Sequence, residues 1–203
     1  MPTGPADVVT ARKWMDEGTR LLLATVDGLA EADFDAPSLL PGWARRHVVA
    51  HVHNNAEGFR RLVHWARTGE ETPMYPDPGR RDAEIEEVAG LPVSDLRSKV
   101  RGSAEALARD LDELPAEAWD HTVLSRQGRE MTATRIPWLR AREVTVHLAD
   151  LDASAGFEDL PPDLLKALVI DVLADRADAG NGPALARWLT GRSAQAPDLG
   201  PWL

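Results

Sequence analysis

The chain has 203 residues and a formal net charge of −10, from 23 lysines and arginines against 33 aspartates and glutamates. Nucleic acids and anionic membranes attract basic surfaces, so this charge argues against either as the main partner. The sequence contains no cysteine, which excludes disulfides, thiolate metal ligands and a thiol nucleophile of the chain's own. Any thiol chemistry that this protein performs therefore needs a small-molecule thiol.

Local cationic spots occur within this acidic composition. The arginine pairs are Arg45-Arg46, Arg60-Arg61 and Arg80-Arg81. They are compatible with a small anionic ligand. No uninterrupted apolar run is long enough to span a bilayer, and the first residues, MPTGPADVVTARKW, lack the apolar core of a signal peptide. We therefore expect a cytoplasmic protein with no membrane association.

The first half of the chain predicts two long helices. The first helix ends near Gly28, and the second runs over residues 42–68, with Pro41 at its start and Gly69 as its stop. The segment that follows, ETPMYPDPGRRD, is rich in proline. We expect it to be a connector that cannot be regular helix.

The second half of the bundle is expected to contain two more long helices. The third covers residues 92–114, where apolar residues form a stripe at helical spacing, and the fourth covers residues 137–153. Between them the chain is irregular or holds a short hairpin around Gln127-Gly128. Four long helices with little convincing strand indicate a mainly all-α protein, a four-helix bundle.

The C-terminal part of the sequence has a different pattern. After Gly156, the segment FEDLPPDLLKALVIDVLADRADAGNGPALARWLTGR predicts two short helices separated by AGNGP. We therefore expect a bundle domain over residues 1–155 and a short, mostly helical C-terminal extension over residues 156–203.

The second helix is polar where apolar residues are expected. Positions 47, 51, 54, 58, 62 and 65 follow one helix face and read His, His, Asn, Gly, Leu and Trp. Polar groups on a buried face must be hydrogen-bonded or bound to a metal. His47 and His51 are therefore both candidate metal ligands.

The fourth helix carries Glu143 and His147 one turn apart, so that their side chains can converge on one point. With an imidazole from the second helix, they would form a site of two histidines and one carboxylate. Zn²⁺ held by three such ligands keeps a fourth position for water or substrate. An ordinary surface pair is the other interpretation of this spacing. Asp150 either hydrogen-bonds a ligand imidazole or is solvated.

Two long segments resemble the signatures of the mycothiol-dependent maleylpyruvate isomerase family, within the DinB-like bundle superfamily. The first is LPGWARRHVVAHVHNNAEGFRRLVHWARTGEETPMYPDPGRRDAEIE, and the second is IPWLRAREVTVHLADLD. The resemblance implies a DinB-like four-helix bundle that holds a divalent metal, usually zinc, through His51, Glu143 and His147. It also implies that Arg81, in the MYP…RD segment, is a catalytic residue.

One departure from the family pattern lies at the C-terminus. Family isomerases usually carry an α/β domain there, whereas only residues 156–203 follow the bundle in this sequence and they lack a strand-rich middle. A functional arginine of that family domain would correspond to Arg192. The shortened region bears on the identity of the substrate more than on the metal.

The resemblance implies an enzyme that uses mycothiol as cosubstrate to isomerise a small anionic cis-enedioate such as maleylpyruvate. A cis double bond cannot rotate until addition of a thiolate makes it single, and elimination after rotation gives the trans isomer. Three alternatives stay open: a mycothiol S-transferase, a metal-dependent hydrolase in which a metal-bound water replaces the thiol, and a non-catalytic metal-binding module. The sequence does not indicate the oligomeric state.

Overall fold

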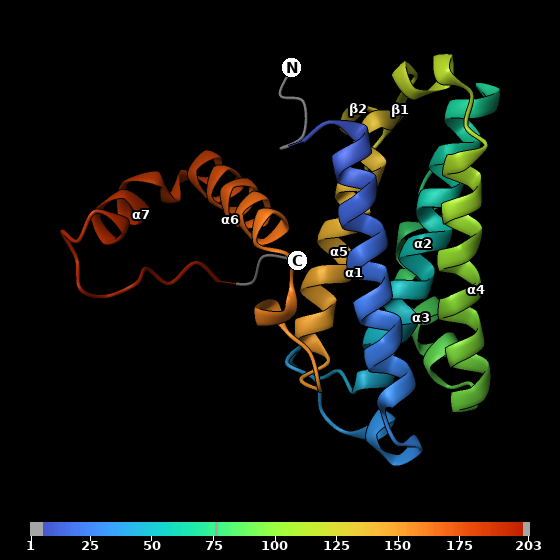
Figure 1. Cartoon of the computed structure of the whole chain (residues 1–203), viewed down its shortest axis with the longest axis horizontal. Helices are drawn as coiled ribbons and strands as arrows, with labels where there is room; N and C mark the ends of the chain where they lie inside the picture. Colours follow the sequence, from blue (N-terminus) through green and yellow to red (C-terminus); the bar gives the residue numbers. More distant parts are fainter. Residues whose placement is uncertain (1–5, 76, 201–203) are drawn as a thin grey trace. The chain divides into compact units, whose positions relative to one another are not determined.

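Four long helices form a bundle in the structure, a computed structural model that describes residues 6–75 and 77–200 (Figure 1). They are α1 (Val8–Gly28), α2 (Arg45–Thr68), α4 (Val93–Asp112) and α5 (Ile136–Asp150). α1 packs along α5, while α2 packs along both α4 and α5. The predicted all-α four-helix bundle is confirmed.

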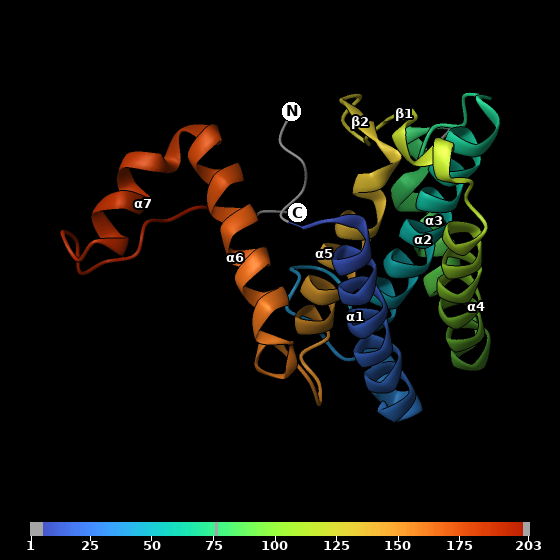
Figure 2. The same ribbon diagram turned by 45° about the horizontal axis from the view of Figure 1, so that its top comes forward.

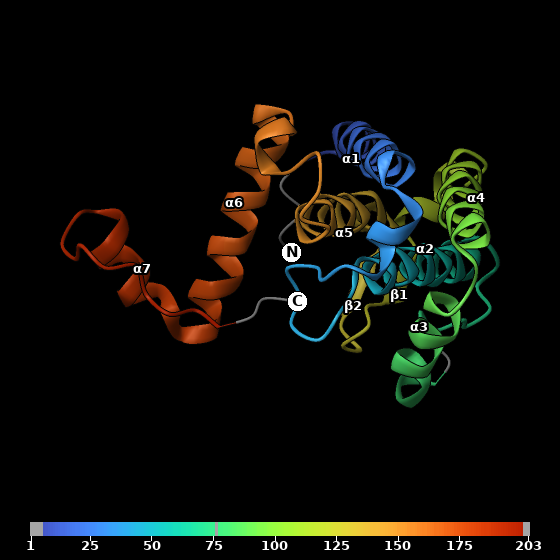
Figure 3. The ribbon, with the colours of Figure 1, turned by 90° about the horizontal axis from the view of Figure 1, so that it is seen from below.

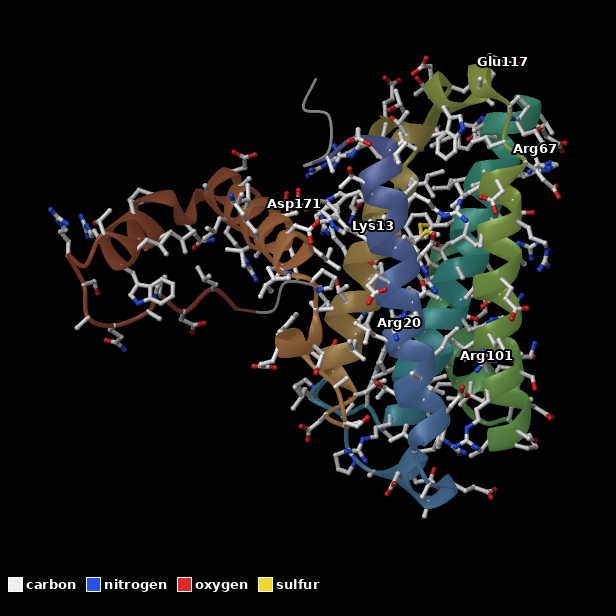
Figure 4. The ribbon with its side chains drawn as sticks, viewed as in Figure 1. Lys13, Arg20, Arg67, Arg101, Glu117 and Asp171 are labelled. Carbon is white, nitrogen blue, oxygen red and sulfur yellow. The ribbon has the colours of Figure 1, made fainter. Side chains whose placement is uncertain are left out.

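The core of the bundle is formed by apolar side chains from all four helices. Leu22, Leu62, Leu107 and Leu148 come one from each helix, and each is at most 1% exposed. Burying a leucine fully contributes roughly 2 kcal/mol. Charged side chains lie on the opposite faces, as Figure 4 shows for Arg20 of α1 and Arg101 of α4.

The second helix begins later than its sequence pattern predicts. Leu40 to Trp43 form a turn, in which the backbone N–H of Trp43 donates to the carbonyl of Leu40 at 3.1 Å. Gly42 has φ +80°, a conformation that a type II turn requires after proline and that glycine adopts without strain. The predicted start at Gly42 is therefore wrong, and α2 begins at Arg45. Its predicted end is confirmed, because Gly69 adopts φ +76° there.

A short helix, α3 (Arg81–Ala89), lies between α2 and α4 in the chain and packs against α2 (Figure 3). The expectation that the whole connector is non-helical is wrong for its last two residues, Arg81 and Asp82. The proline at residue 78 precedes this point, so the chain beyond it is free to become helical.

A hairpin precedes α5. Its strands are β1 (Thr122–Leu124) and β2 (Glu130–Thr132), which pair antiparallel with Val123 opposite Met131. Gly128 adopts φ +73° in the turn, so the hairpin predicted around Gln127-Gly128 is confirmed. Figure 2 shows it at the end of the bundle where α5 begins.

The C-terminal end of α5 is tied to the start of α2. Leu39 donates its backbone N–H to the carbonyl of Asp150 at 2.9 Å. Arg45 donates from Nε to the carbonyl of Leu151 at 2.6 Å and from Nη2 to that of Asp152 at 2.5 Å. Three carbonyls at the end of α5 are thereby satisfied, and this end of α5 is held against the first turn of α2.

The chain divides into two compact units, one ending at Leu160 and the other beginning at Pro161. The second unit contains α6 (Pro162–Arg176) and α7 (Gly182–Leu189), between which Gly180 adopts φ +94°. The two predicted short helices are confirmed, while the boundary at residue 155 stays a prediction. No helix of the described residues is long and apolar enough to cross a membrane.

Gly18 sets the approach of α1 to α5. A Cβ atom at residue 18 would lie 2.8 Å from Cγ2 of Val144 and 2.9 Å from Cγ2 of Thr145, and β-branched side chains have few rotamers with which to move away.

We expect Gly18→Ala to lower the free energy of unfolding by about 1–2 kcal/mol, measured by denaturant titration. Gly102→Ala, on the exposed face of α4 with no atom within 4 Å of its Cβ, should raise it by about 0.5–1 kcal/mol. Equal stabilisation by both substitutions would contradict the close approach.

Candidate metal centre

His51 of α2 meets Glu143 and His147 of α5 inside the bundle. Nε2 of His51 lies 3.2 Å from Oε2 of Glu143, and Nε2 of His147 lies 3.5 Å from the same oxygen. The two imidazole rings are 4.6 Å apart, edge to face. One ligand atom from each residue lies within 4.8 Å of the others. The structure therefore brings together the three residues that helical spacing and the family resemblance single out.

The donor atoms of this cluster fit a divalent metal. His51 and His147 are 5% and 3% exposed, and the Glu143 side chain is 20% exposed. Nε2 of His147 is buried and has no hydrogen-bond partner among the residues that the structure describes, a condition that costs about 1–3 kcal/mol when nothing compensates it. A divalent cation between the three side chains would displace the proton of this nitrogen and bind its lone pair. Two imidazole nitrogens and one carboxylate oxygen are a ligand set that zinc accepts.

Asp150 orients one of the imidazoles. Nδ1 of His147 donates a hydrogen bond to Oδ2 of Asp150 at 2.8 Å, so the hydrogen-bonded alternative for Asp150 is confirmed. The bond holds the ring with Nε2 toward Glu143 and places a proton on Nδ1, the arrangement in which a histidine ligates through Nε2.

Burial and charge shift the three groups in different directions. Burial lowers the pKa of His51 below its ordinary value. For His147, burial acts against the charged form, but Asp150 and Glu143 outweigh it and raise its pKa to about 9. Burial also acts against ionisation of Glu143, yet the two imidazoles hold the pKa of that carboxyl well below its ordinary value. In the metal-free cluster, the Glu143 carboxylate is therefore held between a neutral His51 and a protonated His147.

His47, the other candidate histidine, faces a different group of atoms. Its Nδ1 accepts a hydrogen bond from the backbone N–H of Ala44 at 3.1 Å, and its Nε2 lies 3.4 Å from Oε2 of Glu86. His47 thus caps the start of α2. The Trp43 ring packs 5.8 Å from that of His51, which agrees with a packing role for this tryptophan.

Arg81 begins α3 and places its guanidinium beside the cluster. Nη2 of Arg81 lies 3.3 Å from Nδ1 of His51, and Nη1 donates to Oδ1 of Asp82 at 2.9 Å. A cation therefore lies beside His51, on the side of the ring opposite to Glu143. Burial, with Glu143 adding to it, raises the pKa of the nearby Tyr75 phenol. Arg192, in the second unit, hydrogen-bonds the carbonyl of Thr190, and its functional role stays a prediction.

Two residues near the cluster, Arg140 and Tyr75, were not identified from the sequence. Arg140 is 1% exposed and lies four residues before Val144, on the same stripe as Val144, Leu148 and Leu151. A charged residue in an apolar stripe was the signal that could have identified it. Tyr75 is the one tyrosine of the sequence, and it lies in an irregular connector where no periodicity indicates which way a side chain faces.

Comparisons with known proteins give the relatives of this chain. Residues 15–152 match the family model described as the mycothiol maleylpyruvate isomerase N-terminal domain. The crystal structure of a mycothiol-dependent maleylpyruvate isomerase is 35% identical, with a TM-score of 0.83 over 88% of this chain and 75% of that one. A histidine-to-alanine mutant of such an isomerase is 36% identical, with a TM-score of 0.80 over 85% of this chain and 72% of that one.

A more distant structure shares only the fold. YfiT from Bacillus subtilis, a four-helix bundle of unusual topology, is 16% identical, with a TM-score of 0.56 over 71% of this chain and 85% of that one. It supports the four-helix bundle fold. No curated protein sequence matches the chain.

The bond between His147 and Asp150 sets the charge of the metal-free cluster. We expect Asp150→Asn to lower the pKa of His147 from about 9 by about 1 to 2 pH units, because an amide no longer favours the imidazolium. Imidazole ¹⁵N chemical shifts of the metal-free protein, followed against pH, measure this change.

Asp152→Asn is the matched control for that titration. Asp152 adopts φ +47°, which asparagine tolerates, and the contact of this residue with Arg45 is made by its backbone carbonyl. The pKa of His147 should not move in this variant. An equal shift in both variants would mean that general charge, and not the hydrogen bond, raises the pKa.

Proposed function

This chain belongs to the mycothiol maleylpyruvate isomerase N-terminal domain family, and from that membership we propose that it is a metal- and mycothiol-dependent cis–trans isomerase. The proposed substrate class is a small cis-enedioate such as maleylpyruvate. The observation that carries the proposal is the meeting of His51, Glu143 and His147, whose ligand atoms lie within 4.8 Å of one another.

Three side chains would hold the metal, for which zinc is our proposal. His51 and His147 contribute Nε2, and Glu143 contributes Oε2, the atoms that already face one another. When bound, zinc supplies an open fourth position at which a thiol loses its proton and is held as the thiolate. His147 must give up its second proton for this purpose, while Asp150 keeps Nδ1 protonated and Nε2 directed at the site.

The reaction needs a nucleophile from outside the chain, because the chain has no cysteine. The thiolate of mycothiol adds to the alkene carbon β to the ketone, and the electron pair of the double bond moves to the carbonyl oxygen. The former double bond is now single and rotates. The electron pair then returns, the C–S bond breaks, and the trans isomer leaves with no net change in protons.

Arg81 is suited to the negative charge of the substrate. Its guanidinium donates to Nδ1 of His51 in the metal-free protein, which requires that Nδ1 carry no proton. If Nε2 of His51 held the proposed metal, the ring proton would reside on Nδ1, and this nitrogen would no longer accept a hydrogen bond from Arg81. The guanidinium is then free to bind a substrate carboxylate in two-pronged fashion or to stabilise the developing enolate.

The proposed function predicts that isomerisation requires both metal and thiol. The zinc-loaded protein should convert maleylpyruvate to its trans isomer only when mycothiol is present, measured by chromatography of the products. His51→Ala should lose the activity and most of the bound zinc, measured by elemental analysis. His47→Ala is the matched control, because its histidine caps α2, and it should keep the metal.

Each other outcome of that experiment supports a different activity. Equal zinc content in His51→Ala and the wild type would remove the proposed metal site. A product that retains the thiol would indicate an S-transferase, and turnover without any thiol would indicate a hydrolase.

A second prediction concerns Arg81. We expect Arg81→Met to lower kcat/KM by about 10²-fold while metal content stays unchanged, since a charge-assisted two-pronged contact is lost. Arg81→Lys should recover only part of the loss, because an ammonium lacks the planar fork. Arg80→Met, the change of an exposed arginine one residue earlier, is the control. Activity of Arg81→Met equal to that of the control would exclude the proposed role.

A further inference from the structure

Arg140 is a buried guanidinium between α2 and α5. It is 1% exposed. Its Nη1 donates to the carbonyl of Val52 at 2.9 Å and to Oδ1 of Asn55 at 2.6 Å. Its Nη2 is buried and has no hydrogen-bond partner within residues 6–75 and 77–200.

The charge of Arg140 is not neutralised by the groups that it hydrogen-bonds. Both acceptors, a peptide carbonyl and a side-chain amide, are neutral, and burial of a charge without a hydrogen-bonded counter-ion is unfavourable. Burial lowers the pKa of Arg140 to about 10, so the guanidinium is still charged at neutral pH. An apolar residue at this position of the stripe would pack without that cost.

The charge lies next to the metal cluster. Arg140 is three residues before Glu143 and therefore on neighbouring positions of the same helix face, and its electrostatic partners are Glu143 and Tyr75. Oε2 of Glu143 is also the oxygen atom that Nε2 of His51 and Nε2 of His147 both approach. Once a divalent cation engages Glu143, the charge of Arg140 is left without its main counter-charge, and Arg81 adds a second guanidinium at the same site.

We propose that Arg140 makes the open position of the metal centre selective for anionic ligands, such as thiolates and carboxylates, over neutral ones. The inference rests on the proposed function, because it needs the metal. It assigns Arg140 a role through its charge and not through contact with the ligand. A purely structural role, as a hydrogen-bonded link from α5 to α2, would affect anionic and neutral ligands alike.

The test compares one anionic and one neutral ligand of the same metal. Co²⁺ replaces zinc in the full-length protein, and azide or imidazole is titrated while the visible absorption of cobalt is recorded. We expect Arg140→Met to weaken azide binding roughly tenfold or more, as for unit charges some 10 Å apart at an effective dielectric of about 20. Imidazole binding should change less than about twofold, since a neutral ligand has no net charge to interact with. Arg140→Lys keeps the charge and should restore the preference for azide.

Two further variants separate charge from packing. Arg101→Met removes an exposed arginine of α4 that pairs with Asp27 (Figure 4) and should leave both affinities unchanged. The double variant Asn55→Leu with Arg140→Met removes the charge without leaving the Asn55 amide unpaired, and it should fold even if the single variant does not.

The outcomes distinguish this inference from the proposed function. An unchanged ratio of azide to imidazole affinity in the cobalt-loaded Arg140→Met protein or the double variant would overturn the role of Arg140 and leave the metal centre intact. Equal weakening of both ligands would assign Arg140 the structural role and also overturn the inference. Failure of the wild-type protein to bind cobalt would contradict the metal centre itself.

Discussion

The approach of Nε2 of His51 to Oε2 of Glu143, 3.2 Å across the boundary between α2 and α5, is the contact on which the site depends. The two residues are 92 positions apart in the chain, so only the packing of the two helices holds them together. Arg45 fixes the end of α5 against the start of α2, and Arg140 joins the middle of the two helices through Val52 and Asn55. A metal site requires its ligands to be placed within about 0.5 Å, and these links make the bundle rigid where that precision is needed.

Around the contact between His51 and Glu143, buried polar groups take the place of apolar side chains. Two imidazoles and a guanidinium, all at most 5% exposed, replace side chains that would each have added to the core. Their burial is tolerated because most of their polar atoms are bonded, with Asp150 on His147 and Asn55 on Arg140. Among the described residues, two atoms of this group have no partner, Nε2 of His147 and Nη2 of Arg140, and they belong to the candidate metal centre and to its cationic neighbour. Unsatisfied groups in a native structure call for an explanation, and the proposed metal supplies one for Nε2 of His147.

The helices and the cluster were accessible from the sequence because both are periodic. The 3.6-residue repeat indicates α1, α2, α4 and α5, and the four-residue spacing of Glu143 and His147 puts them on one face. Periodicity could not choose between His47 and His51, which share a face, and that choice came from the family resemblance. The features that the sequence did not reveal depend on turns and tertiary contacts. Gly42 completes a turn before α2, so the helix begins later than the sequence pattern predicts. The sequence of α3 has no strong apolar periodicity. The position of Tyr75 depends on the tertiary contacts of an irregular connector.

The absence of cysteine and the presence of buried cations both agree with the proposed use of an external thiol. In the proposed reaction, an external thiol enters with its own solvation and meets a site whose proposed metal and neighbouring cations favour the thiolate. The substrate of an isomerase that works in this way is itself anionic, so the cations that favour the thiolate also favour the substrate. On the proposed function, the chain therefore provides positive charge and geometry, which a rigid bundle can hold permanently, and a small-molecule thiol provides the nucleophile.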